Sequence, residues 1–406
     1  MNGDVSNSVI EDLVKAINRI ENRLTEIETA LNLRWEKSGT EETIELPRKT
    51  GEEDDSLELA IGEFWFARIG ILAFLLGMFF LITQPLDNYP PLLPVAVGYV
   101  LSLALIIIPE VWLKSFKYIS GFLVGGGAAL LYLTTLRLHF FGAEPIITSR
   151  FFVVILLLVV GAITIGIAFK RQSVYLTALA ELFFIMTALV TEIPLLVFVM
   201  LTLISISVVQ LSLRSNSPNL MVFGIIFTYL AHSLWFVNNP LLGHNLEITT
   251  GFQYNLIFLL AYLLIYGVGS LMLIKDKKQE LDELFITIIN TSLGYGLFLL
   301  ISILSGIKNL GIVHLSAFVV LMVIAILFWT KEKSRFGSFV YAMFAYAALS
   351  TAIIASYNEP AFFILLCWQS IVVISSALWF RSKFIIVANI FIFGGILLSY
   401  FILTIL

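Results

Sequence analysis

Long hydrophobic segments recur from residue 64 to the end of the chain, and short polar segments separate them. Each segment is long enough for an α-helix to cross a bilayer, which takes about 20 apolar residues. None shows the polar–apolar alternation of barrel strands. The pattern predicts an all-α, polytopic transmembrane helical bundle of about 13 spans. The predicted spans are 64–84, 91–110, 118–136, 147–169, 173–191, 193–213, 219–237, 252–274, 284–304, 311–330, 337–357, 359–380 and 383–405.

Residues 1–35 follow a different pattern, in which apolar residues recur at alternating steps of three and four. They form the a/d seam of three heptads, and the outer positions are charged. We expect a cytoplasmic coiled-coil helix that joins protomers into a homo-oligomer; the alternative is an amphipathic helix packed on the protein's own membrane domain. The mixture of Ile and Leu does not decide between dimer and trimer. The seam consists of Ile10, Leu13, Ile17, Ile20, Leu24, Ile27 and Leu31.

Residues 36–63 show no regular spacing of apolar residues and carry an acidic block, Glu52–Glu53–Asp54–Asp55. Gly, Pro and Ser break regular structure, and a run of like charges favours a solvated chain. We therefore expect three parts: the coiled-coil helix at 1–35, an acidic flexible tether at 36–63, and a transmembrane domain of repeated helical hairpins at 64–406.

Basic residues of the membrane region alternate between the two sides of the predicted bundle. The loops after the even-numbered spans carry 13 Lys and Arg residues, whereas the opposite loops and span ends carry Arg137, Arg150 and Lys308. The positive-inside rule places the basic loops in the cytoplasm. The N-terminus is then cytoplasmic, the C-terminus is extracytoplasmic, and the first span acts as an uncleaved anchor.

Composition supports the membrane assignment and excludes several classes of protein. Hydrophobic residues make up 59% of the chain, charged residues make up 13%, and the mean hydropathy is +0.97. Residues 1–63 hold 16 acidic and 7 basic residues, which argues against nucleic acid as a partner. The chain has neither a Walker A motif nor a metal-ligand spacing nor a hydrolase elbow. We predict no cofactor, and the missing motifs favour a protein that is not an enzyme.

The first span carries a pattern that resembles a known family. The stretch Glu63–Leu81 reads EFWFARIGILAFLLGMFFL. It is similar to the first span of a family of bacterial predicted membrane proteins classed as domain of unknown function two-three-three-nine. The resemblance implies a bacterial inner-membrane protein and implies no activity. The chain departs from the family where prolines replace a basic motif after the span. The matching residues are Trp65, Arg68, Ile69, Gly70 and Gly77, and the prolines are Pro85, Pro90 and Pro91.

Ionisable residues within spans are costly, so each is a candidate site. Glu181 lies about midway along the span 173–191, where a proton carrier, a cation carrier or an anchor for a substrate amine is one interpretation. The other is a neutral carboxylic acid that holds helices together through hydrogen bonds. His232 is a second intramembrane candidate, for which a packing role competes with a ligand role. Asn290 and Gln369 are expected to form hydrogen bonds between helices.

A looser group of polar residues maps to the predicted outer face. One interpretation is an ordinary wetted rim; the other is a pocket for an anionic amphiphile such as a lipid-linked molecule. In that pocket Arg137 and Arg150 would hold phosphate or carboxylate, and His139 or Glu144 would act as acid or base. The group contains Asp87, Asn88, Arg137, His139, Glu144, Arg150, Glu192, His244, Glu247, Lys308, His314 and Glu359.

Three functions fit this pattern. The first is a transporter or flippase-like protein that handles a small solute or amphiphile in the cell envelope. The second is a membrane-embedded transferase that uses a lipid-linked donor, with Asp87 as its acid. The third is a non-catalytic scaffold that the coiled coil oligomerises. No motif identifies a substrate.

Overall fold

The computed structural model describes residues 90–111, 117–141, 145–249, 254–273, 280–331 and 335–379, with scattered positions in 69–80 and 387–401. Within these ranges the regular structure is helical, with eleven long helices. They are α4 (Leu92–Val111), α5 (Lys117–Arg137), α6 (Arg150–Arg171), α7 (Val174–Val190), α8 (Pro194–Ser215), α9 (Pro218–Phe236), α10 (Asn255–Leu273), α11 (Glu280–Leu304), α12 (Leu310–Thr330), α13 (Arg335–Ser356) and α14 (Ala361–Trp379), and one 3-10 turn, η2 (Pro240–Leu242), precedes α10.

Local sequence accounts for several helix ends. Pro194 and Pro218 open α8 and α9, where the missing N–H of proline costs nothing. Gln172 and Asn216 follow α6 and α8 in the left-handed conformation that commonly ends a helix. Ser173 caps α7 by accepting a hydrogen bond from the backbone N–H of Leu176. These signals keep the α6–α7 and α8–α9 connections very short.

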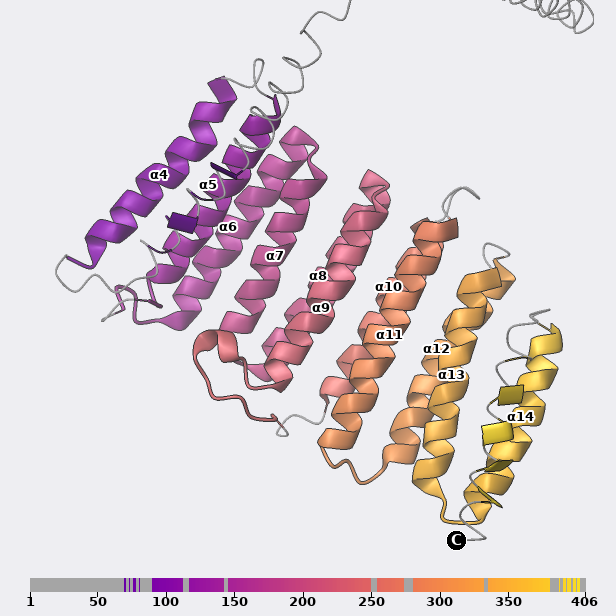
Figure 1. The fold of residues 1–406 in the computed structure, drawn as a ribbon. Coiled ribbons are helices and arrows are strands. Elements are labelled where there is room, and N and C mark those ends of the chain that lie inside the picture. Colours follow the sequence, from indigo (N-terminus) through magenta and orange to yellow (C-terminus); the bar gives the residue numbers. More distant parts are fainter. Residues whose placement is uncertain are drawn as a thin grey trace, which may run out of the picture. The chain divides into compact units, whose positions relative to one another are not determined.

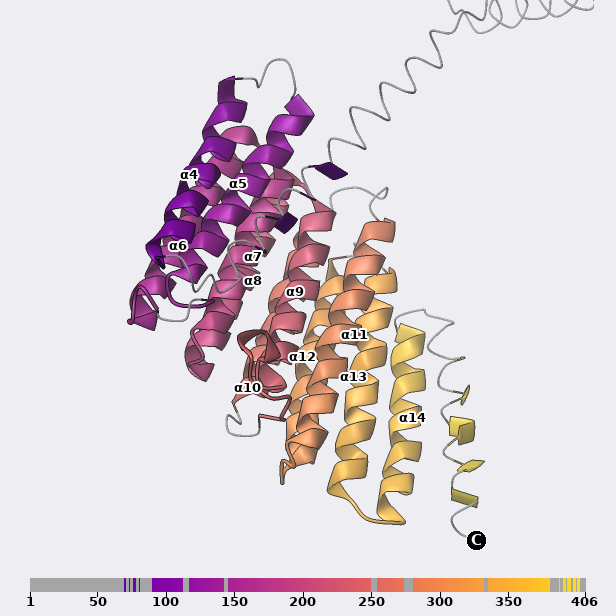
Figure 2. The same ribbon diagram turned by 60° about the vertical axis from the view of Figure 1, so that its left-hand side comes forward.

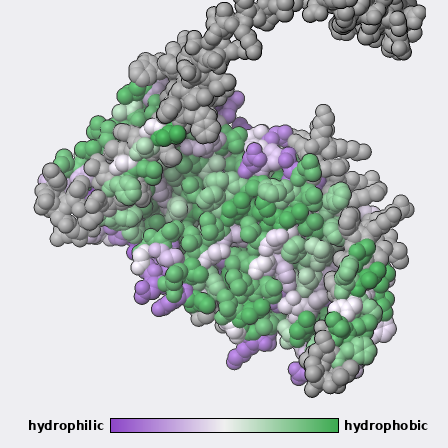
Figure 3. Space-filling model, viewed as in Figure 1, coloured by the Kyte–Doolittle hydropathy of each residue, from purple (hydrophilic) through white to green (hydrophobic). Residues whose placement is uncertain are grey.

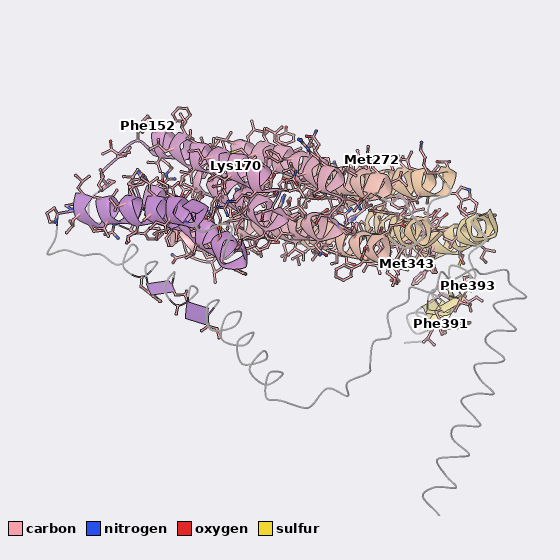
Figure 4. All side chains as sticks on the ribbon, turned by 90° about the horizontal axis from the view of Figure 1, so that it is seen from above. Phe152, Lys170, Met272, Met343, Phe391 and Phe393 are labelled. Atoms are coloured by element: carbon pink, nitrogen blue, oxygen red, sulfur yellow. The ribbon has the colours of Figure 1, made fainter. Side chains whose placement is uncertain are left out.

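The helices follow one another as antiparallel hairpins and form two layers (Figure 1). One layer contains α6, α8, α10 and α12, and the other contains α5, α7, α9, α11 and α13. Within the first layer α8 packs on α10 and α10 packs on α12, whereas α6 and α8 make at most marginal contact. Instead, both α6 and α8 pack on α7 of the other layer. Figure 2 and the view from above in Figure 4 show the same layering.

Each predicted span from 91–110 to 359–380 corresponds to one described helix, with ends that differ by at most four residues. Eight of the described helices are long and apolar enough to cross a membrane, and α7 is a shorter apolar helix. The close division at residues 191–194 is confirmed, because α7 and α8 are separate helices. Most of the first and last predicted spans, and all of the predicted coiled coil, lie outside the described residues. The count of 13 spans therefore stays a prediction.

Helix α11 begins at Glu280, four residues before the predicted span at 284. The predicted span begins later because it counted only apolar residues. Asp282 and Glu283 lie in the first turn, where negative charge interacts favourably with the helix dipole. The longer helix includes Glu283, which is buried.

The outside of the described bundle is strongly apolar. Phe151 and Ile312 are 73% and 70% exposed, and similar side chains cover much of the surface. Figure 3 shows a broad hydrophobic face with hydrophilic residues gathered toward its margins. Soluble proteins rarely expose apolar patches of this size, whereas a lipid-facing surface requires them.

Glycines let α8 approach two neighbouring helices closely. Gly224 of α9 lies directly against Val208, and a Cβ built on Gly269 of α10 would lie 2.7 Å from Cγ2 of Val209. Lipid tails are as apolar as the helix surfaces, so the hydrophobic effect does not drive helices together in a membrane, and close packing of this kind contributes most of their association. The two valines therefore fix α8 between α9 and α10.

Replacing Gly224 with alanine is expected to destabilise the bundle by about 1–3 kcal/mol, because the new methyl group overlaps Val208. Thermal unfolding in detergent would measure the loss. The matched control is Gly296→Ala in α11, whose Cβ would meet no atom within 4 Å. We expect that control to be neutral or to stabilise by up to about 1 kcal/mol. Equal melting temperatures for the two variants would contradict the packing argument.

Candidate functional site

A groove opens where α6 and α8 separate, and we call it the Arg150 groove. It has a volume of about 480 Å³ and lies between the first part of α6 and the first part of α8. Its lining is apolar except for Arg150 and Thr191. The volume falls within the range of about 300–1,000 Å³ that is typical of ligand sites. The lining residues are Arg150, Phe151, Val154, Ile155, Leu158, Phe184, Thr191, Ile193, Leu196, Met200, Leu203 and Ile204.

A second cavity lies at the opposite ends of the same three helices, and we call it the Arg214 pocket. Its volume is about 390 Å³. The guanidinium carbon of Arg214 lies 5.3 Å from the centre of the Phe169 ring, a cation–π distance. Figure 4 labels Phe152 and Lys170, which lie near the two ends of α6. The lining residues are Ala168, Phe169, Gln172, Ser173, Val174, Thr177, Leu211, Arg214 and Ser215.

The two cavities lie on one continuous stripe of α7 and one of α8. On α7, Thr177 lines the Arg214 pocket and Phe184 lines the Arg150 groove. Steps of four and three residues along α7 lead from Thr177 through Glu181 to Phe184, so all three share a face. On α8, Ser207 occupies the equivalent place between Leu203 and Leu211. Glu181 and Ser207 therefore lie between the two cavities.

Glu181 is fully buried and is joined to α8 by a hydrogen bond. The Ser207 hydroxyl donates to Oε1 of Glu181 across 2.7 Å. The other carboxyl oxygen, Oε2, has no hydrogen-bond partner among the described residues. Tyr266 of α10 lies close enough to Glu181 for an electrostatic interaction. The carboxyl group is thus only half satisfied: one oxygen joins α7 to α8 through Ser207, and the other has no hydrogen-bond partner among the described residues.

Phe184 separates Glu181 from the Arg150 groove. A Cβ on Gly161 of α6 would lie 2.7 Å from Cε1 of Phe184, so the ring rests directly on the α6 backbone. Gly161 is the residue that makes this contact possible. Phe184 also lines the groove.

Arg150 forms a small polar cluster at the outer rim of its groove. It makes an ion pair with Glu192, and Nε2 of His244 lies 3.4 Å from the other oxygen of that carboxylate. The guanidinium carbon also lies 5.7 Å from the centre of the Phe140 ring. The cluster therefore joins the start of α6, the α7–α8 turn and the loop before α10.

The other residues predicted for an anion site lie in different surroundings. Arg137 ends α5 and is buried, with 5% of its surface exposed. His139 places Nδ1 2.9 Å from the carbonyl oxygen of Ile147. Asp87 lies outside the described residues. Arg150 pairs with Glu192, and Glu192 in turn contacts His244; the sequence placed these three residues on the same face without pairing them.

His232 is fully buried in an aromatic environment. Its ring centre lies 4.6 Å from Phe198, 6.0 Å from Tyr262 and 6.2 Å from Trp235. Neither ring nitrogen has a hydrogen-bond partner within the described part of the chain. Phe198 and Ser207 are nine positions apart on α8, or about 13 Å along the helix axis. His232 and Glu181 therefore belong to separate sites.

A row of buried polar side chains crosses the bundle beside Glu181. We call it the tyrosine seam, and it consists of Thr228, Tyr229, Tyr266, Asn290 and Tyr341. Thr228 of α9 lies 2.8 Å from the Tyr266 hydroxyl. The Tyr229 hydroxyl donates to Oδ1 of Asn290 at 2.9 Å, and Nδ2 of Asn290 donates to the Tyr341 hydroxyl at 3.1 Å. Asn290 also donates to the carbonyl oxygen of Leu263. These contacts confirm that Asn290 joins helices, but the sequence analysis missed the tyrosines, whose only signal was their interior position.

Two further polar residues also join helices. Gln369 of α14 donates to the carbonyl oxygen of Tyr346 at 2.9 Å, as expected. His314 was expected at the outer face but is fully buried, and it contacts Ser302 and Tyr295 of α11. No group of three His, Cys, Asp or Glu residues in the described part of the chain is arranged to hold a metal ion.

The comparisons with known proteins agree with the resemblance noted in the first span. Residues 62–405 match a family described as "Predicted membrane protein (DUF2339)". No curated protein and no solved structure matches the chain. Because the match covers most of the chain and the described helices are long and apolar, the chain is a membrane protein that belongs to the DUF2339 family.

Proposed function

We propose that this protein is a gradient-driven transporter that moves an anionic amphiphile along the groove between α6 and α8, with Glu181 as its proton-carrying group. The observation that carries the proposal is the position of Glu181, a half-satisfied carboxyl midway between two cavities. An ionised carboxylate away from water is costly, so Glu181 favours either bound proton or bound cation. Binding of a proton or cation at Glu181 would therefore be coupled to binding of a ligand that enters from either cavity.

The lining of the Arg150 groove suits an amphiphile. Side chains such as Leu158 and Leu203 would contact its hydrocarbon part, while Arg150 would hold an acidic head group through a bidentate fork. Glu192 now occupies that fork, and His244 gives Glu192 an alternative partner. An arriving anion would therefore replace Glu192 at Arg150 without leaving the carboxylate alone.

The membrane orientation forms part of the proposal. By the positive-inside rule, the Arg214 pocket with Lys170 and Arg171 faces the cytoplasm of a bacterium, and the Arg150 groove faces outward across the inner membrane. Thirteen spans and a cytoplasmic coiled coil that forms a homo-oligomer complete it. The contact of Phe184 with Gly161 closes the outer path to Glu181, so transport requires this ring to move.

The alternative functions lack a comparable observation. The transferase depends on Asp87 and the scaffold depends on residues 1–35, and both lie outside the described residues. Of the three functions, only the transporter depends on residues that the structure describes.

Replacing Glu181 with glutamine is expected to abolish the response of transport to a proton gradient, because the amide cannot carry a proton. The assay uses proteoliposomes that contain fluorescent phosphatidylglycerol, whose flipping is followed by dithionite quenching under an imposed pH gradient. We expect the gradient-driven rate to fall at least about tenfold. Glu247→Gln, an exposed carboxyl in the loop before α10, should keep the rate of the unchanged protein. Gradient-driven flipping by the Glu181→Gln variant would remove Glu181 from the mechanism.

Replacing Arg150 with glutamine is expected to weaken retention of phosphatidylglycerol. Loss of a hydrogen bond to a charged group costs about 1.5–3 kcal/mol, so affinity should fall about tenfold or more. Native mass spectrometry from nanodiscs of phosphatidylglycerol and phosphatidylcholine would measure the bound lipid.

Two controls accompany this experiment. Lys308→Gln removes an exposed cation at the same side of the bundle and should leave retention unchanged. The double variant Arg150→Gln, Glu192→Gln also removes the carboxylate that would otherwise be left to repel the lipid. It should still lose the lipid, because the guanidinium group that binds the head group is gone. Retention of phosphatidylglycerol by the double variant would show that Arg150 does not bind the head group.

A further inference from the structure

We infer that Arg150, Glu192 and His244 form a proton-coupled anion site at the rim of the Arg150 groove, where a lipid phosphodiester and one proton bind together. The phosphodiester binds Arg150, and the proton binds Nε2 of His244. The inference rests on the proposed function only in treating Arg150 as the group that holds the head group. It does not involve Glu181.

The contacts of His244 are fully satisfied only when both ring nitrogens carry a proton. Nδ1 lies 3.1 Å from the carbonyl oxygen of Asn238, and Nε2 lies 3.4 Å from Oε1 of Glu192. A backbone carbonyl and an ionised carboxylate can only accept hydrogen bonds. A neutral imidazole has a single N–H, so when Nδ1 donates to Asn238, Nε2 presents a lone pair to the carboxylate. A proton on Nε2 turns this contact into an ion pair.

The loop between α9 and α10 holds the His244 ring in this place. Asn238 and Asn239 have left-handed backbone conformations, with φ of 64° and 49°, which asparagine adopts more readily than most residues. The Asn238 side chain donates to the carbonyl oxygen of Asn245. The buried Asn239 side chain donates to the carbonyl oxygen of Leu189 in α7. The loop is thus bound both to itself and to the end of α7, which keeps the imidazole beside the α7–α8 turn.

Glu192 is shared between two basic groups at the mouth of the groove. Oε2 pairs with Nη1 of Arg150, while Oε1 faces His244. The neighbours of Glu192 in the chain, Thr191 and Ile193, both line the groove. The side chains of Arg150, Glu192 and His244 are 37%, 30% and 41% exposed. Water therefore reaches all three, and the proton comes from the aqueous phase at this end of the bundle.

Other ionisable groups near the cluster do not contact His244 in the part of the chain that the structure describes. Glu247, a second carboxyl group of the same loop, is exposed and makes no ion pair with His244 there. His139 makes its hydrogen bond to a backbone carbonyl of the α5–α6 loop. Glu192 is thus the acidic group that responds directly to a charge on His244, and Arg150 responds through Glu192.

The two binding events compensate each other in charge. Without a ligand, Arg150 and Glu192 neutralise each other and His244 is uncharged. When a phosphodiester takes the guanidinium fork, Glu192 needs another cation, and protonated His244 supplies it. The site gains one negative and one positive charge, and the N–H bond at Nε2 is the one bond that forms. Because coupling between two ligands is reciprocal, a lower pH strengthens binding of the anion.

Native mass spectrometry from nanodiscs of phosphatidylglycerol and phosphatidylcholine tests the coupling at about pH 5 and about pH 8, the range in which histidine ordinarily changes charge. The phosphodiester of phosphatidylglycerol keeps its single negative charge throughout. We expect at least about tenfold greater retention of phosphatidylglycerol at the lower pH, within the usual range of coupling between sites. Glu181→Gln should give the same ratio, because Glu181 is not part of this site.

Two substitutions should both abolish the pH dependence, but at opposite levels of retention. His244→Asn keeps a donor for the Asn238 carbonyl and removes Nε2, so Glu192 stays at Arg150 and retention is low at both pH values. Glu192→Gln removes the competing carboxylate, so retention is high at both. A folding defect lowers retention and cannot produce the second result. The matched control Glu247→Gln should keep the ratio of the unchanged protein.

The outcomes separate this inference from the proposed function. Retention that does not depend on pH, or that still depends on pH after His244→Asn, overturns the coupling and leaves the transporter standing. Coupled retention in a protein that flips no lipid supports the site and rejects the transporter. Retention that does not depend on Arg150 at either pH overturns both. Displacement of the lipid by dissolved glycerophosphoglycerol, its head group without acyl chains, overturns the assignment to a lipid in favour of a soluble phosphodiester.

Discussion

Polar groups inside hydrocarbon must find partners within the protein, and this constraint decides where most interior side chains of the bundle lie. Serine and threonine hydroxyls return to their own helix, as Ser205 does to the carbonyl oxygen of Leu201. Larger groups cannot do so and meet across helices, as Asn290 and Tyr341 do. Among the described side chains, a buried oxygen without a hydrogen-bond partner, such as Oε2 of Glu181, is then conspicuous. A folding explanation accounts for the satisfied groups but not for this one.

The groove arises from the same packing rules. Where glycine faces a branched side chain, adjacent helices of one layer come together, as α8 and α10 do at Gly269. Between α6 and α8 the contact passes instead through α7, and bulky side chains such as Met200 face an open space. The site therefore lies at a discontinuity in an otherwise regular layer, and no loop or inserted domain is needed to create it.

Sequence alone predicted much of the fold and less of the site. Apolar length identified each described helix, and the short connection at residues 191–194 was enough to separate α7 from α8. Glu181 stood out because a carboxyl group in an apolar run is costly. The pairing of Arg150 with Glu192, 42 positions away, depends on tertiary packing that no local pattern encodes. The sequence analysis missed Tyr266 and Tyr341, because tyrosine is an ordinary residue in a membrane helix. Their role depends on hydrogen-bond partners on other helices, which only the fold supplies.

The valines at 208 and 209 have a mechanical consequence. Short branched side chains against glycine backbone make a stiff joint, since no flexible side chain can absorb a displacement. On its other flank α8 meets the Arg150 groove, whose side chains have room to rearrange. The bundle is thus rigid on one side of α8 and compliant on the other, so a force that widens the groove displaces α6 while α8 through α10 act as the fixed frame.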